Sequence, residues 1–309
     1  MGAQLSCIIT TKDKNDPKLK DLLYSIEQQT YRNFETIIVT EGNSESAKAI
    51  GLKRANGKVI CILASDNYLN DNEFFEKCLK PIIESENAPF PVYASYPHQY
   101  YYYKEDNILN RYFALFGVND PIPFYLKKAD KFSYLYIHGK SNLDFAYFYF
   151  NKCLTFGDNG FFIRKDILKQ ADIEHYYHID VIQDIINLGY KNFAYVNTTI
   201  WHRTGGNIFK FFLKRFRYAD KFSKGRRWHM VERKDLPRLF WFIISTLTLI
   251  YPLYLSVKGY KIIKDRAWFL HLLICLITIG VYGLWVMKKS VLSFAALVGP
   301  KALKGVLVQ

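Results

Sequence analysis

The chain has 309 residues, of which half are hydrophobic, and it carries a formal net charge of +14. This length allows one α/β domain of about 200 residues together with a smaller appendage. The cysteines show no paired spacing, which argues against both a disulfide framework and a zinc site, so we expect them to be reduced. They are Cys7, Cys61, Cys78, Cys153 and Cys275.

Apolar runs with strand composition alternate with helical stretches near the N-terminus. The predicted strands are Leu5–Thr11, Phe34–Val39 and Lys58–Ala64, and the predicted helices between them are Leu19–Gln29 and Ala47–Ala55. This β-α-β-α-β order predicts an α/β fold built on a mostly parallel sheet, because crossovers between parallel strands are right-handed.

Polar residues follow each of the predicted strands. Thr11, Glu41 and Asp66 stand at the carboxyl ends of these strands, which meet at one edge of a parallel sheet. A carboxylate at that edge can hold a divalent cation against a nucleotide diphosphate. The alternative for Asp66 is a helix cap, because a further helix is predicted at Asn70–Lys80.

Four stretches of this region carry motifs at characteristic spacing. Residues 23–35 match S-I-x-x-Q-T-Y-x-N-F-E almost letter for letter. The others take the places of a first strand and its loop, of V-D-D-G-S and of L-D-x-D-D, and they are Cys7–Asp13, Val39–Asn43 and Leu63–Asn67. Together they resemble the family 2 glycosyltransferases of the GT-A fold, convincingly over residues 4–80 and more weakly to residue 220.

The resemblance implies a site for a nucleotide-diphosphate sugar and a divalent metal ion, Mg2+ or Mn2+. The chain departs from the family pattern twice, because Ala64 replaces the first acid of the D-x-D motif and Thr40 replaces an acid that reads the base. The carboxylate contacts to the donor would therefore fall on Asp66 and Glu41. The candidate donor-binding residues are Thr10, Thr11, Glu41, Asn43, Ser65 and Asp66, with Arg215 and Arg217 closing over the phosphates.

The resemblance also implies a metal ligand and a catalytic base. His202 follows a predicted strand and is similar to the family's histidine near the end of the catalytic domain, so Asp66 and His202 are the candidate metal ligands. A lone histidine is more commonly structural. In the family the base is the acid of an E-D pair, whereas here His178 takes that place and the acid is displaced. We favour Asp180 as the base of an inverting reaction, with Asp158 as the alternative and a structural cap as a second interpretation of either.

Residues 93–149 are crowded with tyrosine, so we expect them to pack over the sheet edge and to wall the acceptor site. Asn119 and Asp120 are candidate acceptor-binding residues, although the same residues predict a turn before Pro121. Asn159, in a glycine-bounded turn, is the third candidate. Leu143–Phe156 is predicted as a strand.

Two C-terminal segments have almost no charge and approach the length that crosses a bilayer, residues 239–257 and 267–287. Pro252 would kink the first, and His271 near one end of the second would be satisfied by a helix partner or by snorkelling. The alternative is a pair of buried or interfacial helices. Residues 291–308 are interrupted by glycine, proline and lysine, which predicts an interfacial or re-entrant segment.

The segment Lys210–Arg238 is strongly basic and interleaved with phenylalanine. It predicts amphipathic helices on an anionic membrane surface. Nucleic-acid binding is the rival interpretation, but a basic segment beside an apolar one is typical of membrane topology, so we expect no nucleic acid. The loop Lys258–Arg266 is also basic, which conflicts with two crossing helices because it would then face outward.

These features predict three regions. Residues 1–207 form a GT-A catalytic domain with a donor half, 1–92, and an acceptor half, 93–207; residues 208–238 form the interface helices; residues 239–309 form a multi-pass membrane region. No leader precedes the first strand, so we expect the catalytic domain to be cytoplasmic.

The predicted activity is inverting transfer of a sugar to a lipid-linked acceptor, either a polyprenyl phosphate or a glycan on polyprenyl diphosphate. Two alternatives stay open. One is a processive polysaccharide synthase, for which two or three spans are too few to build a translocation channel. The other is a non-catalytic membrane scaffold with a decayed transferase domain, an alternative that Ala64 in the D-x-D position supports.

Overall fold

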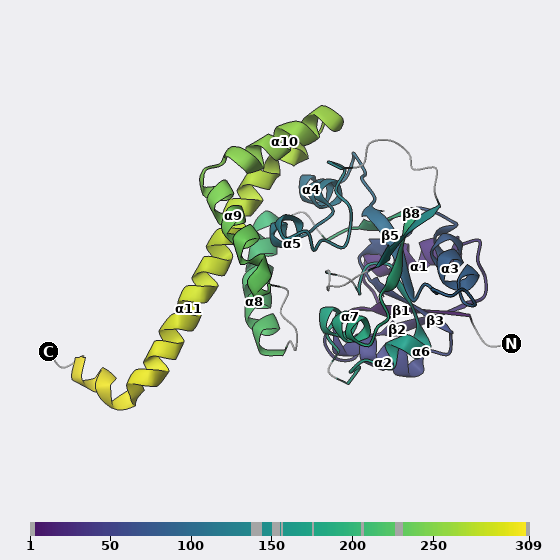
Figure 1. Cartoon of the computed structure of the whole chain (residues 1–309), viewed down its shortest axis with the longest axis horizontal. Coiled ribbons are helices and arrows are strands. Elements are labelled where there is room, and N and C mark those ends of the chain that lie inside the picture. Colours follow the sequence, from purple (N-terminus) through teal and green to yellow (C-terminus); the bar gives the residue numbers. More distant parts are fainter. Residues whose placement is uncertain are drawn as a thin grey trace.

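The computed structural model joins a mixed α/β domain to a region of helices (Figure 1). In the α/β domain a central sheet is flanked by helices on both faces. The structure describes residues 4–136, 144–149, 155, 157–174, 176–204, 207–225 and 231–306.

The sheet has the strand order β2-β1-β3-β7-β5-β8-β4, with β6 paired to β8. Strands β1, β2 and β3 are parallel, β7 runs antiparallel to β3 and β5, and β5 and β8 are parallel. The strands are β1 (Leu5–Thr10), β2 (Phe34–Val39), β3 (Val59–Ala64), β4 (Asn67–Tyr68), β5 (Ala94–Tyr100), β6 (Phe145–Tyr149), β7 (Phe161–Arg164) and β8 (Asn192–His202).

The predicted β-α-β-α-β unit is confirmed. Thr10 lies opposite Val39 in β2 and opposite Ala64 in β3, so the three strands end at the same level. The loops that follow them leave the same edge of the sheet. The expectation that Thr11, Glu41 and Asp66 stand at one edge is therefore correct at the level of the backbone.

Helices cover both faces of the sheet. One core joins the sheet to α1 (Pro17–Glu27) and α3 (Phe74–Glu84). A second core joins the other face to α2 (Ser46–Arg54), α6 (Lys165–Leu168) and α7 (His178–Asn187). Strands buried on both faces need apolar side chains in both directions, which explains the unbroken apolar runs in the sequence.

Two predicted elements differ in length from those observed. The third helix begins at Phe74 and not at Asn70, because the Asp71 carboxylate first accepts a hydrogen bond from the Glu73 backbone N–H at 3.0 Å and holds a turn there. The strand predicted at residues 143–156 is β6, which ends at Tyr149; residues 150–154 and 156 lie outside the described residues.

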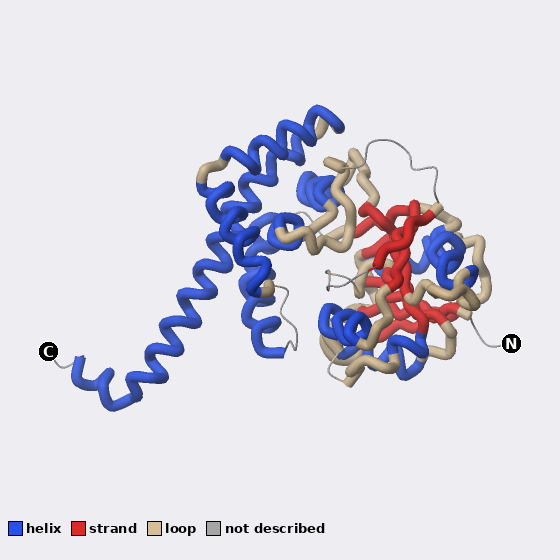
Figure 2. Tube along the Cα trace, in the orientation of Figure 1, coloured by secondary structure: helices blue, strands red, loops and turns tan. Residues whose placement is uncertain are grey.

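The helical region packs on one end of the α/β domain (Figure 2). The third hydrophobic core of the chain lies in this region and contains side chains of α4, α5, α9, α10 and α11 and of the short helix η2. The elements are α4 (Ile108–Phe116), α5 (Pro121–Tyr125), α8 (Ile208–Gly225), η1 (Arg233–Asp235), α9 (Leu236–Leu247), α10 (Ile250–Ile262), η2 (Arg266–Phe269) and α11 (Leu270–Val306).

The first predicted membrane span is wrong as a single helix. Residues 239–257 are divided between α9 and α10, and the two helices are bent by 82° relative to each other. Leu249 at the break has a positive φ of 62°. Pro252 explains the position, because in a continuous helix its ring would meet the carbonyl of Thr248, four residues earlier.

The second predicted span lies within one long helical stretch. Among the described residues, Arg266–Val291 is the single stretch whose length and apolar composition suit a bilayer crossing, unless the bent pair is counted as another. The prediction of a multi-pass region is therefore not supported. The interruption expected within residues 291–308 is also absent, because α11 continues as helix to Val306.

Candidate active site

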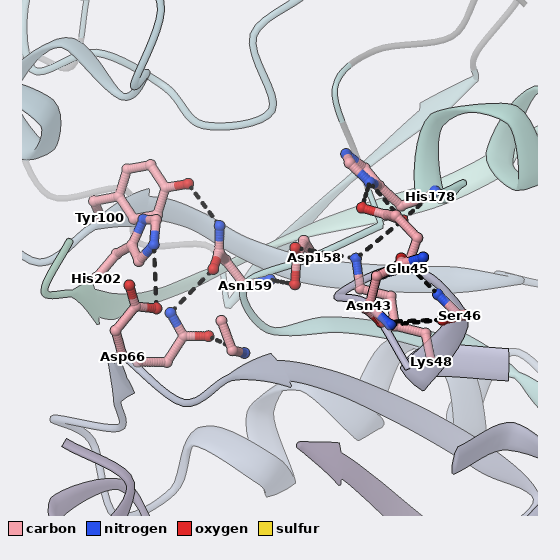
Figure 3. Close-up of polar contacts among 12 residues, drawn as sticks. Asn43, Glu45, Ser46, Lys48, Asp66, Tyr100, Asp158, Asn159, His178 and His202 are labelled. Atoms are coloured by element: carbon pink, nitrogen blue, oxygen red, sulfur yellow. Dashed lines mark hydrogen bonds and ion pairs between the residues drawn. The ribbon is translucent and has the colours of Figure 1, made fainter. Parts of the chain in front are cut away.

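The strongest candidate site lies where β3 and β8 end. Asp66 occupies the turn between β3 and β4, and His202 is the last residue of β8. Strand β4 pairs with β8, which sets the His202 Nε2 atom 3.4 Å from the Asp66 Oδ1 atom (Figure 3). The pair is the one that the sequence predicted as metal ligands. The cap interpretation of Asp66 fails, since the helix that follows begins only at Phe74.

Positive charge surrounds Asp66. Burial alone would raise the pKa of its carboxyl, but the charge and hydrogen bond of His202 and the charges of Lys18 and Lys214 lower the pKa to about 2. Lys18 belongs to α1 and Lys214 to α8, so the cations that act on this carboxylate come from two helices far apart in the chain. The site is therefore an anionic centre within a cationic rim.

A carboxylate beside an imidazole suits a divalent ion such as Mn2+ or Mg2+. Within the described residues there is no cluster of three or more histidine, cysteine, aspartate or glutamate side chains that could enclose a metal alone. Such an ion would therefore need further oxygen ligands from water or from a diphosphate. The residues present fit a metal that binds together with an anionic substrate.

Asn67 and Asn159 tie the Asp66 turn to the turn before β7. The Asn67 side chain accepts a hydrogen bond from the Ala64 backbone N–H at 2.8 Å and donates one to Asn159 Oδ1 at 3.0 Å. Asn159 in turn donates to the Tyr100 hydroxyl at 3.2 Å. This bridge fixes the two turns relative to each other, and it places the predicted acceptor residue Asn159 beside the Asp66 pair (Figure 3).

A second polar cluster stands further along the same edge. The ammonium of Lys48, whose side chain is fully buried, lies 3.1 Å from Asp158 Oδ2 and 3.4 Å from Glu45 Oε2. Burial would lower the pKa of Lys48 and raise that of Glu45. The attraction between the opposite charges outweighs burial, so the pKa of Lys48 is raised and that of Glu45 is lowered.

His178 is attached to the second cluster through Glu45. Its Nδ1 atom lies 3.1 Å from Glu45 Oε1, and its backbone N–H donates to Glu45 Oε2 at 3.0 Å. Gly157 allows the loop before β7 to pass close by, because a Cβ there would lie 2.9 Å from the His178 Cβ. With Nδ1–H donated to the carboxylate, Nε2 is left as a proton acceptor.

The two predicted bases have different surroundings. Asp180 lies in the first turn of α7 and is 0% exposed. Asp158 is partly exposed, but its carboxylate is shared with the ammonium of Lys48. By contrast the His178 side chain keeps 17% of its surface exposed.

The other predicted donor residues lie along the loops of this edge. Thr10 ends β1, Ser65 precedes Asp66 in its turn, and the Thr11 hydroxyl donates to the Asp13 carbonyl at 2.9 Å. The Asn43 side chain accepts bonds from the backbone N–H groups of Glu45 and Ser46 and so shapes the start of α2.

Glu41 is exposed and lies 2.8 Å from Arg54. The hydrogen bond from that guanidinium lowers the pKa of Glu41 to about 2. Arg215 on α8 lies over the Phe211 ring at 4.9 Å, and Arg217 is exposed on the same helix. Their predicted roles at the donor are untested.

Asn119 and Asp120 lie apart from the first cluster, at the start of α5. Asp120 accepts a hydrogen bond from the Ile122 backbone N–H at 2.9 Å, which makes it the N-cap of that helix. Its other oxygen accepts a bond from the Tyr282 hydroxyl of α11 at 2.7 Å. The predicted turn is thus present, and the acceptor role of these two residues stays a prediction.

Sequence reasoning missed Glu45, Lys48 and Asp130. Burial raises the pKa of Asp130, against the charges of Lys131, His202 and His178, so this carboxyl lies within reach of both clusters. The sequence offers one weak signal, a lysine at position 48 among alanine, glycine and leucine in a helix that buries those residues. Nothing comparable marks Glu45 or Asp130.

None of the family models and none of the curated protein sequences matches the chain. Among solved structures, the chain is similar to the mannosyltransferase PcManGT from Pyrobaculum calidifontis in complex with GDP-Man and Mn2+. The identity is 11%, the match covers 94% of this chain and 88% of the other, and the TM-score is 0.47.

Two other solved structures are similar at the same level. S. aureus TarS 1-349 with UDP-GlcNAc shares 12% identity over 87% of this chain and 81% of that chain, with a TM-score of 0.41. Glucosyl-3-phosphoglycerate synthase from Mycobacterium tuberculosis, with Mn2+ and UDP-Glc, shares 12% over 72% and 79%, with a TM-score of 0.42. The fold assignment stands on the sheet and its helices, independently of these likenesses.

Proposed function

We propose that the chain is a metal-dependent glycosyltransferase that moves a sugar from a nucleotide-diphosphate sugar to a membrane lipid-linked acceptor with inversion. The observation that supports it most is the Asp66–His202 pair, set at the carboxyl edge of a parallel sheet within a cationic rim. Open α/β sheets bind their ligands at this edge. A diphosphate supplies both the negative charge that the rim accepts and the oxygen ligands that the pair lacks.

In this proposal Asp66 and His202 would hold the metal, and the metal would supply positive charge that offsets the charge of the diphosphate. The loops after β1 and β2, with Thr10, Thr11, Glu41 and Asn43, face the nucleoside. Lys214 and the neighbouring arginines of α8 bind the phosphates. The candidate residues for this last contact are Arg215 and Arg217.

Three side chains are candidates for the proton acceptor of the attacking hydroxyl. Asp180 was the sequence prediction, but its complete burial argues against direct contact with a substrate. Asp158 is held by Lys48. We favour His178, because Glu45 orients its ring and its side chain is partly exposed.

A lipid-linked acceptor follows from the position of α8. This basic helix contributes Lys214 to the surroundings of Asp66 and packs against α11, which holds most of the long apolar stretch Arg266–Val291. An acceptor anchored in a membrane would thus reach the site beside α8. A processive synthase and a scaffold without activity are the alternatives, and the second predicts no turnover with any donor.

The first test is donor binding and turnover by the purified full-length protein in detergent. Probes are UDP-glucose, UDP-GlcNAc and GDP-mannose with Mn2+, and lipid extracts supply the acceptor. We expect Asp66→Asn to lower turnover by about a hundredfold to a thousandfold, as when a preorganised electrostatic contact is lost. Metal-dependent binding of the nucleoside diphosphate should fall with it.

Asp166→Asn is the matched control, because Asp166 pairs with Arg164 at the opposite edge of the sheet. It should leave binding and turnover unchanged. An Asp66→Asn protein that still binds nucleoside diphosphate in a metal-dependent way would contradict the metal site. A wild-type protein with no turnover on any donor, but intact binding, would favour the scaffold.

The base is tested by comparing three variants that keep donor binding. His178→Ala should lower turnover by about two to four orders of magnitude, and added imidazole should restore part of it. Glu45→Gln should alter the pH profile, since Glu45 acts through His178 as a positioning residue. If Asp180→Asn or Asp158→Asn gives the large loss and His178→Ala does not, the base is that aspartate.

A further inference from the structure

The outer face of the helical region is apolar. Exposed large apolar side chains recur at helical spacing on α9, α10 and α11, and Figure 1 shows these helices together on the side away from the sheet. On α9 they are Leu236, Phe240, Trp241, Ile244 and Leu247, and on α10 they are Ile250, Leu253, Tyr254 and Val257. The last group consists of Phe269 in η2 and of Leu273, Leu276, Leu284, Met287 and Val291 in α11.

The inner faces of the same helices pack on the protein. Phe242, Leu255 and Ile274 are buried in the core that contains α4 and α5. Gly259 lets α10 approach Trp268 so closely that a Cβ would lie 2.3 Å from its ring. A helix with the protein on one face and lipid on the other is apolar all round, and composition alone cannot separate it from a helix that crosses a bilayer.

Contacts along α11 distinguish a helix that lies between protein and lipid from a helix that crosses the bilayer. Tyr112 of α4 and Tyr125 of α5 place their hydroxyls 3.0 and 3.3 Å from the two ring nitrogens of His271. Further along, Tyr282 donates to Asp120, and Lys288 lies 5.7 Å from the Phe216 ring centroid of α8. Contacts of polar and charged side chains to α4, α5 and α8 therefore accompany this helix almost to the end of its apolar stretch.

The length of the apolar stretch Arg266–Lys288 can be compared with the thickness of a bilayer. From Arg266 to Lys288 an α-helix rises by about 33 Å, which is slightly more than the roughly 30 Å hydrocarbon core of a bilayer. If this stretch crossed the membrane, Asp120 and the basic helix α8 would lie at the depth of the lipid tails. The cost of charge at that depth argues against the crossing.

Both ends of the α9–α10 pair are also fixed to the α/β side. Before α9, Asp235 binds the ammonium of Lys128 at 2.6 Å. After α10, Asp265 accepts a hydrogen bond from the Tyr102 hydroxyl at 2.6 Å and lies 3.3 Å from Arg111. Lys128, Tyr102 and Arg111 all belong to the segment between β5 and β6. A helix pair whose two ends bind this one segment enters and leaves from one side.

We infer that α9, α10 and the stretch Arg266–Val291 form a platform that lies in the plane of one anionic membrane leaflet and does not cross it. The basic residues of α8 and of the α10–α11 loop then stay on the side of the α/β domain, beside the headgroups. This removes the conflict that two crossing helices create with the basic loop at residues 258–266. The inference depends on the membrane attachment proposed above.

The test is the sidedness of single cysteines in the full-length protein. Cys7, Cys61, Cys78 and Cys275 are buried, so a Cys153→Ser background serves for labelling with a membrane-impermeant maleimide. The cysteines are introduced at exposed Lys12, at Lys264 and at Ser290, and inside-out and right-side-out vesicles are compared.

The platform predicts that all three positions react from the same side. A single crossing by α11 would reverse Ser290 alone, and two crossings would reverse Lys264 alone; either pattern overturns the inference. Protein that stays in the soluble fraction would overturn both the platform and the membrane attachment. Donor binding by that soluble protein would leave the transferase proposal standing, so the two failures are distinguishable.

Discussion

The α/β domain and the helical region arrange polar and apolar groups in opposite ways. In the α/β domain both faces of the sheet are apolar and buried, and charged side chains gather at one edge, where Lys48 is fully buried between two carboxylates. In the helical region the polar contacts point toward the α/β domain, and large apolar side chains face outward. One chain thus joins a domain with buried apolar side chains to a helical region with exposed apolar side chains.

The largest effect on stability is expected from replacing Lys48, the buried lysine of the α/β domain. Lys48→Met leaves the buried Glu45 without its strongest partner, and breaking such a pair costs about 3–5 kcal/mol. The free energy of unfolding, measured in denaturant for the detergent-solubilised protein, should fall by that amount. Lys53→Met is the control, because the Lys53–Glu174 pair is exposed and the variant should change stability by less than about 1 kcal/mol. Equal losses of unfolding free energy in the two variants would mean that the buried ion pair is worth no more than the exposed one.

A smaller effect is expected on the outer surface. The double variant Phe240→Glu and Leu253→Glu places charge in the exposed apolar stripes and should weaken binding to phosphatidylglycerol vesicles by about tenfold to a hundredfold. The two side chains are 65% and 45% exposed, so each would gain about half of the roughly 1.5–3 kcal/mol that full burial contributes. Cosedimentation with the vesicles measures the bound fraction of each protein. Ile83→Glu, at an exposed apolar position of α3, is the matched control and should bind as the wild type does. A loss in the control as well would show that charge, and not this face, decides binding.

The most gradual effect is the pH dependence of the polar cluster. The pKa of Glu45 is lowered in the folded chain, so its contribution to stability is complete above its ordinary pKa near 4.5 and is lost as the pH falls below it. The pKa of Lys48 is raised, so its contribution persists through neutral pH and is lost only in strong base. Unfolding midpoints between pH 7 and pH 3 should fall for the wild type and fall less for Glu45→Gln. Parallel curves for the two proteins would refute this role.

The sequence predicted the parallel core and the first polar pair for physical reasons that are local. The strands β1 and β3 are largely apolar runs, β2 ends in Ile37, Ile38 and Val39, and turn residues follow each strand, so their identity and order are visible without tertiary information. Asp66 was found because it directly follows such a strand. His202 was found through the family resemblance, and its pairing with Asp66 depends on the contact between β4 and β8.

The second polar cluster was not predictable in the same way. Glu45 and His178 lie 133 residues apart in the chain, and Lys48 and Asp158 lie 110 apart, so neither pattern nor spacing brings them together. The membrane region was misjudged for a related reason. Apolar composition reports that a helix avoids water, but it does not report whether protein or lipid covers each face, and the bend at Leu249 appears only in the folded chain.

Helix α8 makes the two regions interdependent as well as adjacent. Its Lys214 contributes to the field that keeps Asp66 ionised, while its Phe211 packs on Phe113 of α4 and its Phe216 meets Lys288 of α11. A fragment that ends at residue 207 would keep the Asp66–His202 pair and lose one of its cations. The candidate site is therefore not a self-sufficient module, because one of the charges acting on Asp66 comes from a helix that packs against α11.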